Sequence, residues 1–424
     1  MKLKLTIPNY FVLYFFLMIL LYHYKVKTYF YWDNIGYLLE KDFGFSLLRF
    51  AIATGIFFLD IFLLRSIDRS RFIFIVICIF FAILTVPSLV AFTSGVVYPI
   101  RLLFYHQALF VGLFLFSRIR LSFSTFPVIN KGQALYLLLV LTTIGAIPYL
   151  VVYGPHINLK NLFLVDVYKT RKIMGGLSNP YFGYTYSVFT KIIIPLIIVF
   201  ALELKKKVWV TVGVLYLILF YLFGAHKTVY AGLLVVLVFY RFSFTQSVKY
   251  IVKYSSVFIV LFLILALIGF DYPWILSFRR IHFLPTLLDI CYMDFFGEKP
   301  LMWSESIFGS FIDYPYDVKH TNLIGQVYFN RDDVSANNGL ISDGFMNFGS
   351  WGVFINIALV SIYFMVLNSL KIPSKYFGLF VLIIFSFISS SLFTVLLTHG
   401  AFALLLVAIF LLNDKTNSNY NQEF

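Results

Sequence analysis

Three cations and a glycine pair stand close together in the first half of the chain. Lys169, Arg171 and Lys172 are followed by Gly175 and Gly176. Arginine presents a fixed fork of N–H donors that matches phosphate, and glycine lets the backbone approach an anion closely. The pattern favours a phosphate-type anion with Arg171 and Lys172 as ligands, and its alternative is a solvated basic loop touching anionic lipid. The chain has no GxxxxGK[ST] motif, which argues against a nucleotide site.

A second group of candidates lies between residues 271 and 343. Its cations are Arg279, Arg280 and Arg331, and its imidazoles are His282 and His320. An imidazole can take a proton from a hydroxyl near neutral pH, and arginines can stabilise a diphosphate leaving group. The residue types leave open which group would be the base, and the competing candidates are His226, His282, His320, His399, Asp317, Asp332 and Asp333.

Four further cations lie inside or beside apolar segments, namely Arg49, Arg101, Lys191 and Lys227. Charge is costly at such depths, so these residues are functional candidates. If the helices that carry them converge, the four cations line a basic cavity. The alternative is that each long side chain reaches the lipid head groups independently.

The elements that must position these residues follow from composition. Of 424 residues, 61% are hydrophobic and only 12% are charged, whereas about a quarter of the residues in a soluble domain are charged. A membrane-crossing helix needs about 20 apolar residues. The sequence therefore predicts an all-α, polytopic integral membrane protein with about 12 transmembrane helices. The expected spans are 7–23, 44–64, 72–94, 98–117, 134–153, 187–204, 208–223, 228–241, 254–270, 344–367, 376–396 and 399–412.

The loops between these spans predict an orientation. Lysine and arginine concentrate in alternate loops, which is typical of cytoplasmic loops, and the acids gather on the other side. The alternation places both termini in the cytoplasm, and the first span is expected to be a retained anchor. The net charge of +14 is explained by this topology, so no nucleic-acid partner is expected.

Two outer loops are long, at 154–186 and 271–343, and loops of this length are uncommon unless they are functional. The expected organisation is a single membrane domain over 1–424 with a flexible cytoplasmic tail at 413–424. No metal or cofactor is expected. The pair Glu40 and Asp42 keeps a metal-dependent alternative open, because carboxylates suit Mg²⁺ or Mn²⁺.

The segment 337–352 reads NNGLISDGFMNFGSWG and runs directly into an apolar span. It resembles the glycine-rich segment that opens a late membrane helix in Wzy-type oligosaccharide repeat-unit polymerases of O-antigen and capsule pathways. That family also carries two periplasmic loops, each with an arginine followed at a distance by a glycine. Here Arg171 precedes Gly183 and Arg331 precedes Gly344. The residues that carry the motif are Gly339, Asp343, Gly344, Asn347, Gly349 and Gly352.

The resemblance implies a glycosyltransferase of the bacterial inner membrane. It would move a growing glycan from undecaprenyl pyrophosphate to an incoming lipid-linked repeat unit at the periplasmic face. The related O-antigen ligases use a histidine and several arginines, and His320 with Asn322 is similar to the histidine motif of those ligases. We therefore expect His320 to act as the base or to orient the acceptor hydroxyl, and we expect Arg331 to be a second catalytic residue, near the pyrophosphate. The residues expected around the pyrophosphate are Arg171, Lys172, Arg279, Arg280, Lys227, Arg49 and Arg101.

The implied partners are the undecaprenyl-pyrophosphate-linked oligosaccharide, the lipid bilayer, a chain-length regulator and a flippase. Two alternatives share the topology. An O-antigen ligase would use the same donor, and a lipid-linked oligosaccharide flippase or transporter would use the same lipid. A flippase has no evident use for the two long outer loops.

Overall fold

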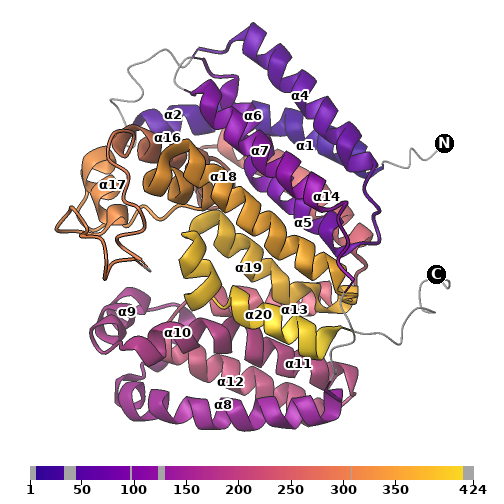
Figure 1. Cartoon of the computed structure of the whole chain (residues 1–424), viewed down its shortest axis with the longest axis vertical. Helices are drawn as coiled ribbons and strands as arrows, with labels where there is room; N and C mark the ends of the chain where they lie inside the picture. Colours follow the sequence, from indigo (N-terminus) through magenta and orange to yellow (C-terminus); the bar gives the residue numbers. More distant parts are fainter. Residues whose placement is uncertain (1–5, 33–43, 96–97, 123–128, 307, 414–424) are drawn as a thin grey trace. The chain divides into compact units, whose positions relative to one another are not determined.

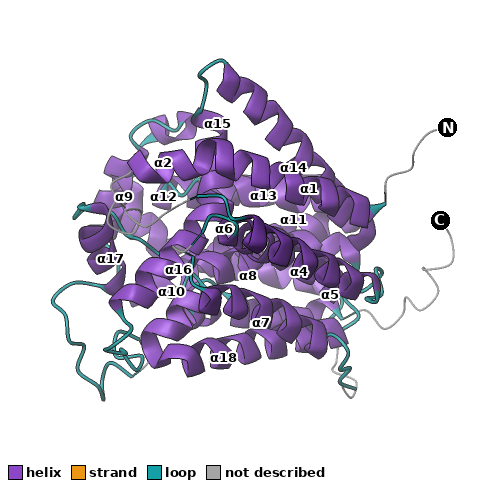
Figure 2. Ribbon diagram, turned by 90° about the horizontal axis from the view of Figure 1, so that it is seen from above, coloured by secondary structure: helices purple, strands orange, loops and turns teal. Residues whose placement is uncertain are grey.

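The computed structural model describes residues 6–32, 44–95, 98–122, 129–306 and 308–413. Over these residues the chain forms helices joined by loops, with no strand (Figure 2). Eight of the helices described are long and apolar enough to cross a membrane, which confirms the all-α, membrane-protein class. They are Ile7–Phe30, Leu47–Arg65, Phe72–Phe92, Lys131–His156, Pro180–Glu203, Lys207–Gly224, Phe244–Leu267 and Leu340–Ser369.

Four shorter apolar helices fall where the other expected spans lie, and twelve crossings remain a prediction. The four are Ile100–Phe116, Thr228–Phe239, Ser374–Ser389 and Ala401–Leu412. Two of the long helices begin earlier than their hydropathy predicts, at Pro180 and Phe244, because the more polar stretches before their apolar centres remain helical. Hydropathy locates the apolar centre of a helix better than it locates the ends.

Contacts between helices divide the chain into two compact units. Unit 1 comprises Met1–Arg120, Phe244–Val366 and Phe387–Leu392. Within it, α1 packs along α14, and α4 packs against α6. The continuous helix Phe72–Phe92 is buried on every side, as its uniformly apolar sequence requires, whereas most of α14 is left for lipid. Its helices are α1 (Ile7–Leu21), α2 (Lys27–Trp32), α4 (Leu47–Arg65), α5 (Phe72–Phe80), α6 (Val86–Phe92), α7 (Ile100–Phe116), α14 (Phe244–Leu267), α15 (Tyr272–Trp274), α16 (Leu284–Phe295), α17 (His320–Phe329) and most of α18 (Leu340–Ser369).

Unit 2 comprises Leu121–Ser243, Leu367–Ser386 and Phe393–Phe424. Here α11 packs against both α12 and α8, and the three helices run side by side in Figure 1. The core of the unit is aromatic, with the Tyr149 ring against those of Phe182, Phe220 and Phe223. Its helices are α8 (Lys131–Tyr153), α9 (Val167–Gly176), α10 (Pro180–Val188), α11 (Ile194–Glu203), α12 (Lys207–Gly224), α13 (Thr228–Phe239), most of α19 (Phe377–Ser389) and α20 (Ala401–Val407).

The glycine-rich segment of the sequence breaks α18 into two parts. The backbone leaves helical geometry at Phe348 and at Gly349, which has φ +58°. After the break the chain turns back on itself. The Asn356 amide consequently reaches the Leu340 carbonyl and donates to it across 3.0 Å. The 340–347 half-helix therefore lies antiparallel against the first turns of the helix that continues to Ser369.

Glycines permit the close crossing of these two parts. A Cβ placed on Gly352 would stand 2.0 Å from the carbonyl oxygen of Gly344, which is impossible without moving backbone. A Cβ on Gly339 would stand 2.2 Å from the Ile388 carbonyl oxygen, in the same unit. Three of the motif positions, Gly339, Gly344 and Gly352, are thus explained by backbone proximity and Gly349 by its positive φ.

Candidate functional site

The 340–347 half-helix is capped by a loop that arrives from 40 residues upstream. The backbone N–H groups of Leu301 and Met302 donate to the carbonyls of Met346 and Asn347 across 2.8 and 3.1 Å. The Asn347 side-chain oxygen accepts from the Trp303 N–H at 2.7 Å. Carbonyls at a helix end have no partner within the helix, so these bonds satisfy them and fix the 301–303 loop in place.

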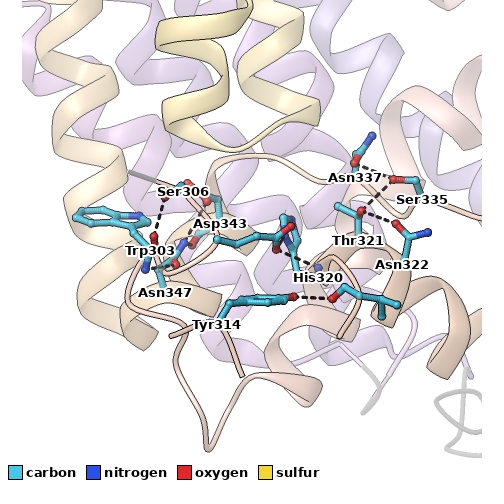
Figure 3. Close-up of polar contacts among 12 residues, drawn as sticks. Trp303, Ser306, Tyr314, His320, Thr321, Asn322, Ser335, Asn337, Asp343 and Asn347 are labelled. Carbon is cyan, nitrogen blue, oxygen red and sulfur yellow. Dashed lines mark hydrogen bonds and ion pairs between the residues drawn. The ribbon is translucent and has the colours of Figure 1, made fainter. Parts of the chain in front are cut away.

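The same loop brings a carboxylate onto His320, the first residue of α17 (Figure 3). Glu305 Oε2 lies 2.5 Å from His320 Nδ1 and 3.1 Å from the His320 backbone nitrogen. Both side chains are partly exposed, and the Tyr292 ring packs 6.0 Å from the imidazole. The Glu305–His320 pair therefore lies where a dissolved or lipid-borne substrate could reach it.

The protonation of this pair follows from its contacts. Burial by itself would raise the pKa of Glu305, but the hydrogen bonds and the charge of His320 outweigh it and hold that pKa below its ordinary value. Glu305 is thus an anionic acceptor, and Nδ1 of His320 donates to it. In the neutral form of the imidazole, this arrangement leaves the lone pair of Nε2 as the site that can take a proton.

Asp343, beside the break in α18, is enclosed by donors. It accepts from the Asn356 amide at 2.9 Å, from the Leu392 backbone N–H at 3.0 Å and from the Asn347 amide at 3.2 Å. The side chain is buried. Its contacts hold the two parts of α18 and the 387–392 segment together, so its role here is positional.

A second buried carboxylate ties the start of α18 to α16 and α7. Asp289 accepts from the Ser342 hydroxyl at 2.6 Å and from the Asn338 amide at 2.9 Å, and its other oxygen lies 3.1 Å from His106 Nε2. These side chains are all buried. This network holds the start of the 340–347 half-helix against α16 and α7, while the 301–303 loop caps its C-terminal end.

Unit 2 carries a separate group of cations. Arg171 on α9 donates through Nε and Nη2 to the Ala225 carbonyl at 3.1 and 3.0 Å, which caps the end of α12. Lys191 donates to the Ser386 hydroxyl at 3.1 Å. His226 is within electrostatic reach of both cations, and desolvation followed by these two charges lowers its pKa to about 4.

His399 completes this group, which we call the unit 2 basic cluster (Arg171, Lys191, His226 and His399). The charge of Lys191 also acts on the His399 imidazole, whose buried Nδ1 has no hydrogen-bond partner among the described residues. Within the described part of the chain, neither Arg171 nor Lys191 forms a salt bridge. Clustered cations without carboxylates favour an anion as counter-charge.

The structure places Arg331 away from His320. Arg331 follows the last turn of α17, where its backbone N–H donates to the Gly325 carbonyl across 3.3 Å. There it forms an exposed ion pair with Asp333 at 2.9 Å, so Asp333 is occupied as well. Asp317 and Asp332 are exposed.

Three of the other predicted cations already have protein partners. Arg49 donates to the carbonyls of Gly95 and Tyr98, and Arg101 lies over the Phe345 ring. Arg279 lies over the Tyr29 ring. Within unit 1, these contacts do not bring the arginines together around His320. Lys172, Lys227 and Arg280 are exposed. Of the other candidate bases, His282 is buried against Phe278, and Glu40 and Asp42 lie outside the described residues.

Sequence reasoning missed Glu305, the partner of His320. It lies 15 residues before the histidine, in a loop without regular periodicity, and the only available signal was one acid among many on the same expected side. His106 and Asp289 were also missed, because a histidine and an aspartate 183 residues apart carry no pairing signal.

Comparisons with known proteins add nothing to this geometry. No family model, curated protein or solved structure matches the chain. Arguments about function therefore start from the Glu305–His320 pair and the unit 2 basic cluster.

The Glu305–His320 pair predicts a pH-dependent contribution to stability. The pKa of Glu305 is lowered in the folded protein, so the pair stabilises the fold above the ordinary pKa of glutamate, about 4.3. That contribution is lost as the pH falls through the lower folded value. We expect Glu305→Gln to lower stability by on the order of 1 kcal/mol near neutral pH.

The measurement is the thermal unfolding midpoint of the purified protein in detergent, for wild type and Glu305→Gln, across the acid range. The difference between the two should be largest above about pH 5 and should vanish in strong acid. A difference that is constant with pH would show that the glutamate charge contributes nothing to the pair.

Proposed function

We propose that this chain is a membrane glycosyltransferase that polymerises undecaprenyl-pyrophosphate-linked oligosaccharide repeat units at the outer face of the bacterial inner membrane. The observation that carries the proposal is the Glu305–His320 pair, which has the composition of a carboxylate-oriented general base. It lies in the segment that charge alternation assigns to the periplasm.

The reaction that fits these groups is a direct displacement at an anomeric carbon. His320 Nε2 takes the proton of the acceptor sugar hydroxyl while the hydroxyl oxygen forms the new bond to the carbon. The bond from that carbon to the phosphate oxygen breaks, and its electron pair leaves with undecaprenyl pyrophosphate. Glu305 keeps the imidazole oriented and stabilises the imidazolium, and the anomeric configuration is inverted.

Cations are needed where the negative charge of the leaving diphosphate develops. Within unit 2, considered by itself, Arg171 and Lys191 form no salt bridge among the described residues, so the basic cluster could bind a phosphate-type anion. The exposed Lys172 and Lys227 belong to the segments that carry Arg171 and His226. Arg331 is assigned no step here because it is paired with Asp333 at the far end of α17.

Deletion of the gene in its host, followed by gel separation of the surface glycan, tests the function. We expect lipid core that carries a single repeat unit, because export and ligation would continue without polymerisation. Loss of every repeat would point to the ligase or the flippase instead. An unchanged ladder of repeats would exclude all three.

A further inference from the structure

Between α8 and α10 the chain exposes an unusual number of large apolar side chains. Phe163 is 83% exposed, Tyr168 is 75% exposed and Leu159 is 64% exposed, and Leu164 and Val165 lie between them. We call these five residues the 159–168 ridge. Large apolar patches on a folded surface mark contact with a membrane or another molecule.

The exposure of the ridge is fixed by the fold beneath it. Asn161 is fully buried, and its amide donates to the Thr170 hydroxyl at 2.8 Å. The Tyr221 hydroxyl of α12 donates to the Asn161 carbonyl at 2.7 Å. From α9, Val167 and Met174 are buried seven residues apart, on one face of the helix. The ridge therefore points outward because the opposite side of the segment is bonded into unit 2.

The position of the ridge between two apolar helices indicates which material the ridge contacts. The helix that ends at His156 and the helix that begins at Pro180 are both long and apolar enough to cross the membrane. The segment between them leaves the bilayer and re-enters it, so it lies at one membrane surface. Continuity with these two helices makes lipid the nearest apolar material to the ridge.

Charge around the ridge is complementary to a lipid surface. Lys160 and Lys169 are exposed within and beside it, and Lys172 follows on α9. Apolar side chains interleaved with lysines are typical of segments that lie in the head-group layer, where the cations meet anionic lipids.

We propose that the 159–168 ridge is an interfacial anchor that inserts Leu159, Phe163 and Tyr168 into the head-group layer and pairs its lysines with anionic lipid. The anchor follows from the spans and the exposed residues, and it holds whether or not the protein is a glycosyltransferase. It sets the depth of α9, which carries Arg171, relative to the membrane surface.

The test places a fluorescent probe on the ridge. Cys78 and Cys291 are both buried, so a cysteine introduced by Phe163→Cys is the site that a maleimide dye reaches in the folded protein. The protein is reconstituted in nanodiscs of phosphatidylcholine and phosphatidylglycerol. Quenching is measured with a lipid that carries a shallow nitroxide and, separately, with aqueous iodide. The matched control is Asp317→Cys, an exposed polar position in the loop before α17.

We expect the probe at position 163 to be quenched by the nitroxide lipid and protected from iodide, with the reverse at position 317. Replacing Lys160, Lys169 and Lys172 with glutamine should weaken the nitroxide quenching several-fold in the presence of phosphatidylglycerol. Quenching by iodide alone would overturn the anchor. Protection from both quenchers would also overturn it, since protein would then cover the ridge. Neither readout depends on glycan synthesis, so the anchor and the proposed function can fail separately.

Discussion

Replacing His320 with alanine is expected to abolish polymerisation while the protein remains folded in the membrane. General-base catalysis by one positioned side chain contributes about 10²–10⁴-fold, so the rate should fall by that factor. The side chain is partly exposed, and its loss opens no core cavity. The measurement is restoration of the glycan ladder in a deletion strain, together with the rate of repeat addition by purified protein on lipid-linked substrate.

Two further variants make the His320 result specific. His156→Ala removes an exposed imidazole from the 154–186 segment and should restore the full ladder. Glu305→Gln preserves the shape of the pair but removes the charge that orients the imidazole, so an intermediate rate is expected. A full ladder from His320→Ala, with normal amounts of protein, would eliminate the histidine as the base.

Replacing Gly352 with alanine is expected to be the most destabilising small substitution in unit 1. Its Cβ would lie 2.0 Å from the Gly344 carbonyl oxygen, and the atom it meets is backbone, which cannot rotate away. The two parts of α18 would have to separate, which would strain the bonds from Asn356 to Leu340 and Asp343. Overpacking of this kind costs about 1–3 kcal/mol or more.

Gly55→Ala is the matched control, because Gly55 lies within α4 and a Cβ there meets nothing within 4 Å. Alanine favours a helix over glycine by about 1 kcal/mol, so this variant should be neutral or slightly stabilised. Thermal unfolding in detergent compares the two. Equal unfolding midpoints for Gly352→Ala and Gly55→Ala would show that the crossing of the α18 parts is loose.

The sequence predicted the membrane class because about 20 consecutive apolar residues leave few other structures open to a segment. It also located the segment 337–352, but it could not show why the glycines are there. Their spacing reflects an antiparallel contact between Gly344 and Gly352, and a helix that reverses at Gly349 has the same hydropathy as one that continues.

The candidate site was predicted only in part. His320 was selected from its residue type and its neighbour Asn322, whereas Glu305 depends on how the 301–303 loop binds Met346 and Asn347. Such a contact between an irregular loop and a helix end leaves no periodic pattern in the sequence from which it could be predicted. The presence of arginine predicted the pyrophosphate ligands less well, because Arg49 and Arg171 both bind carbonyl groups of their own unit.

The cap on the 340–347 half-helix also has a bearing on biosynthesis. The donors at Leu301 and Met302 are made by the ribosome before the carbonyls at Met346 and Asn347 that need them. An unsatisfied carbonyl in hydrocarbon costs several kcal/mol, so the half-helix is stable at membrane depth only after that loop has bound to its end. Vectorial synthesis supplies the loop first. A chain permuted so that residues 340–424 were translated before residue 301 would present the translocation machinery with a helix end that has no partner.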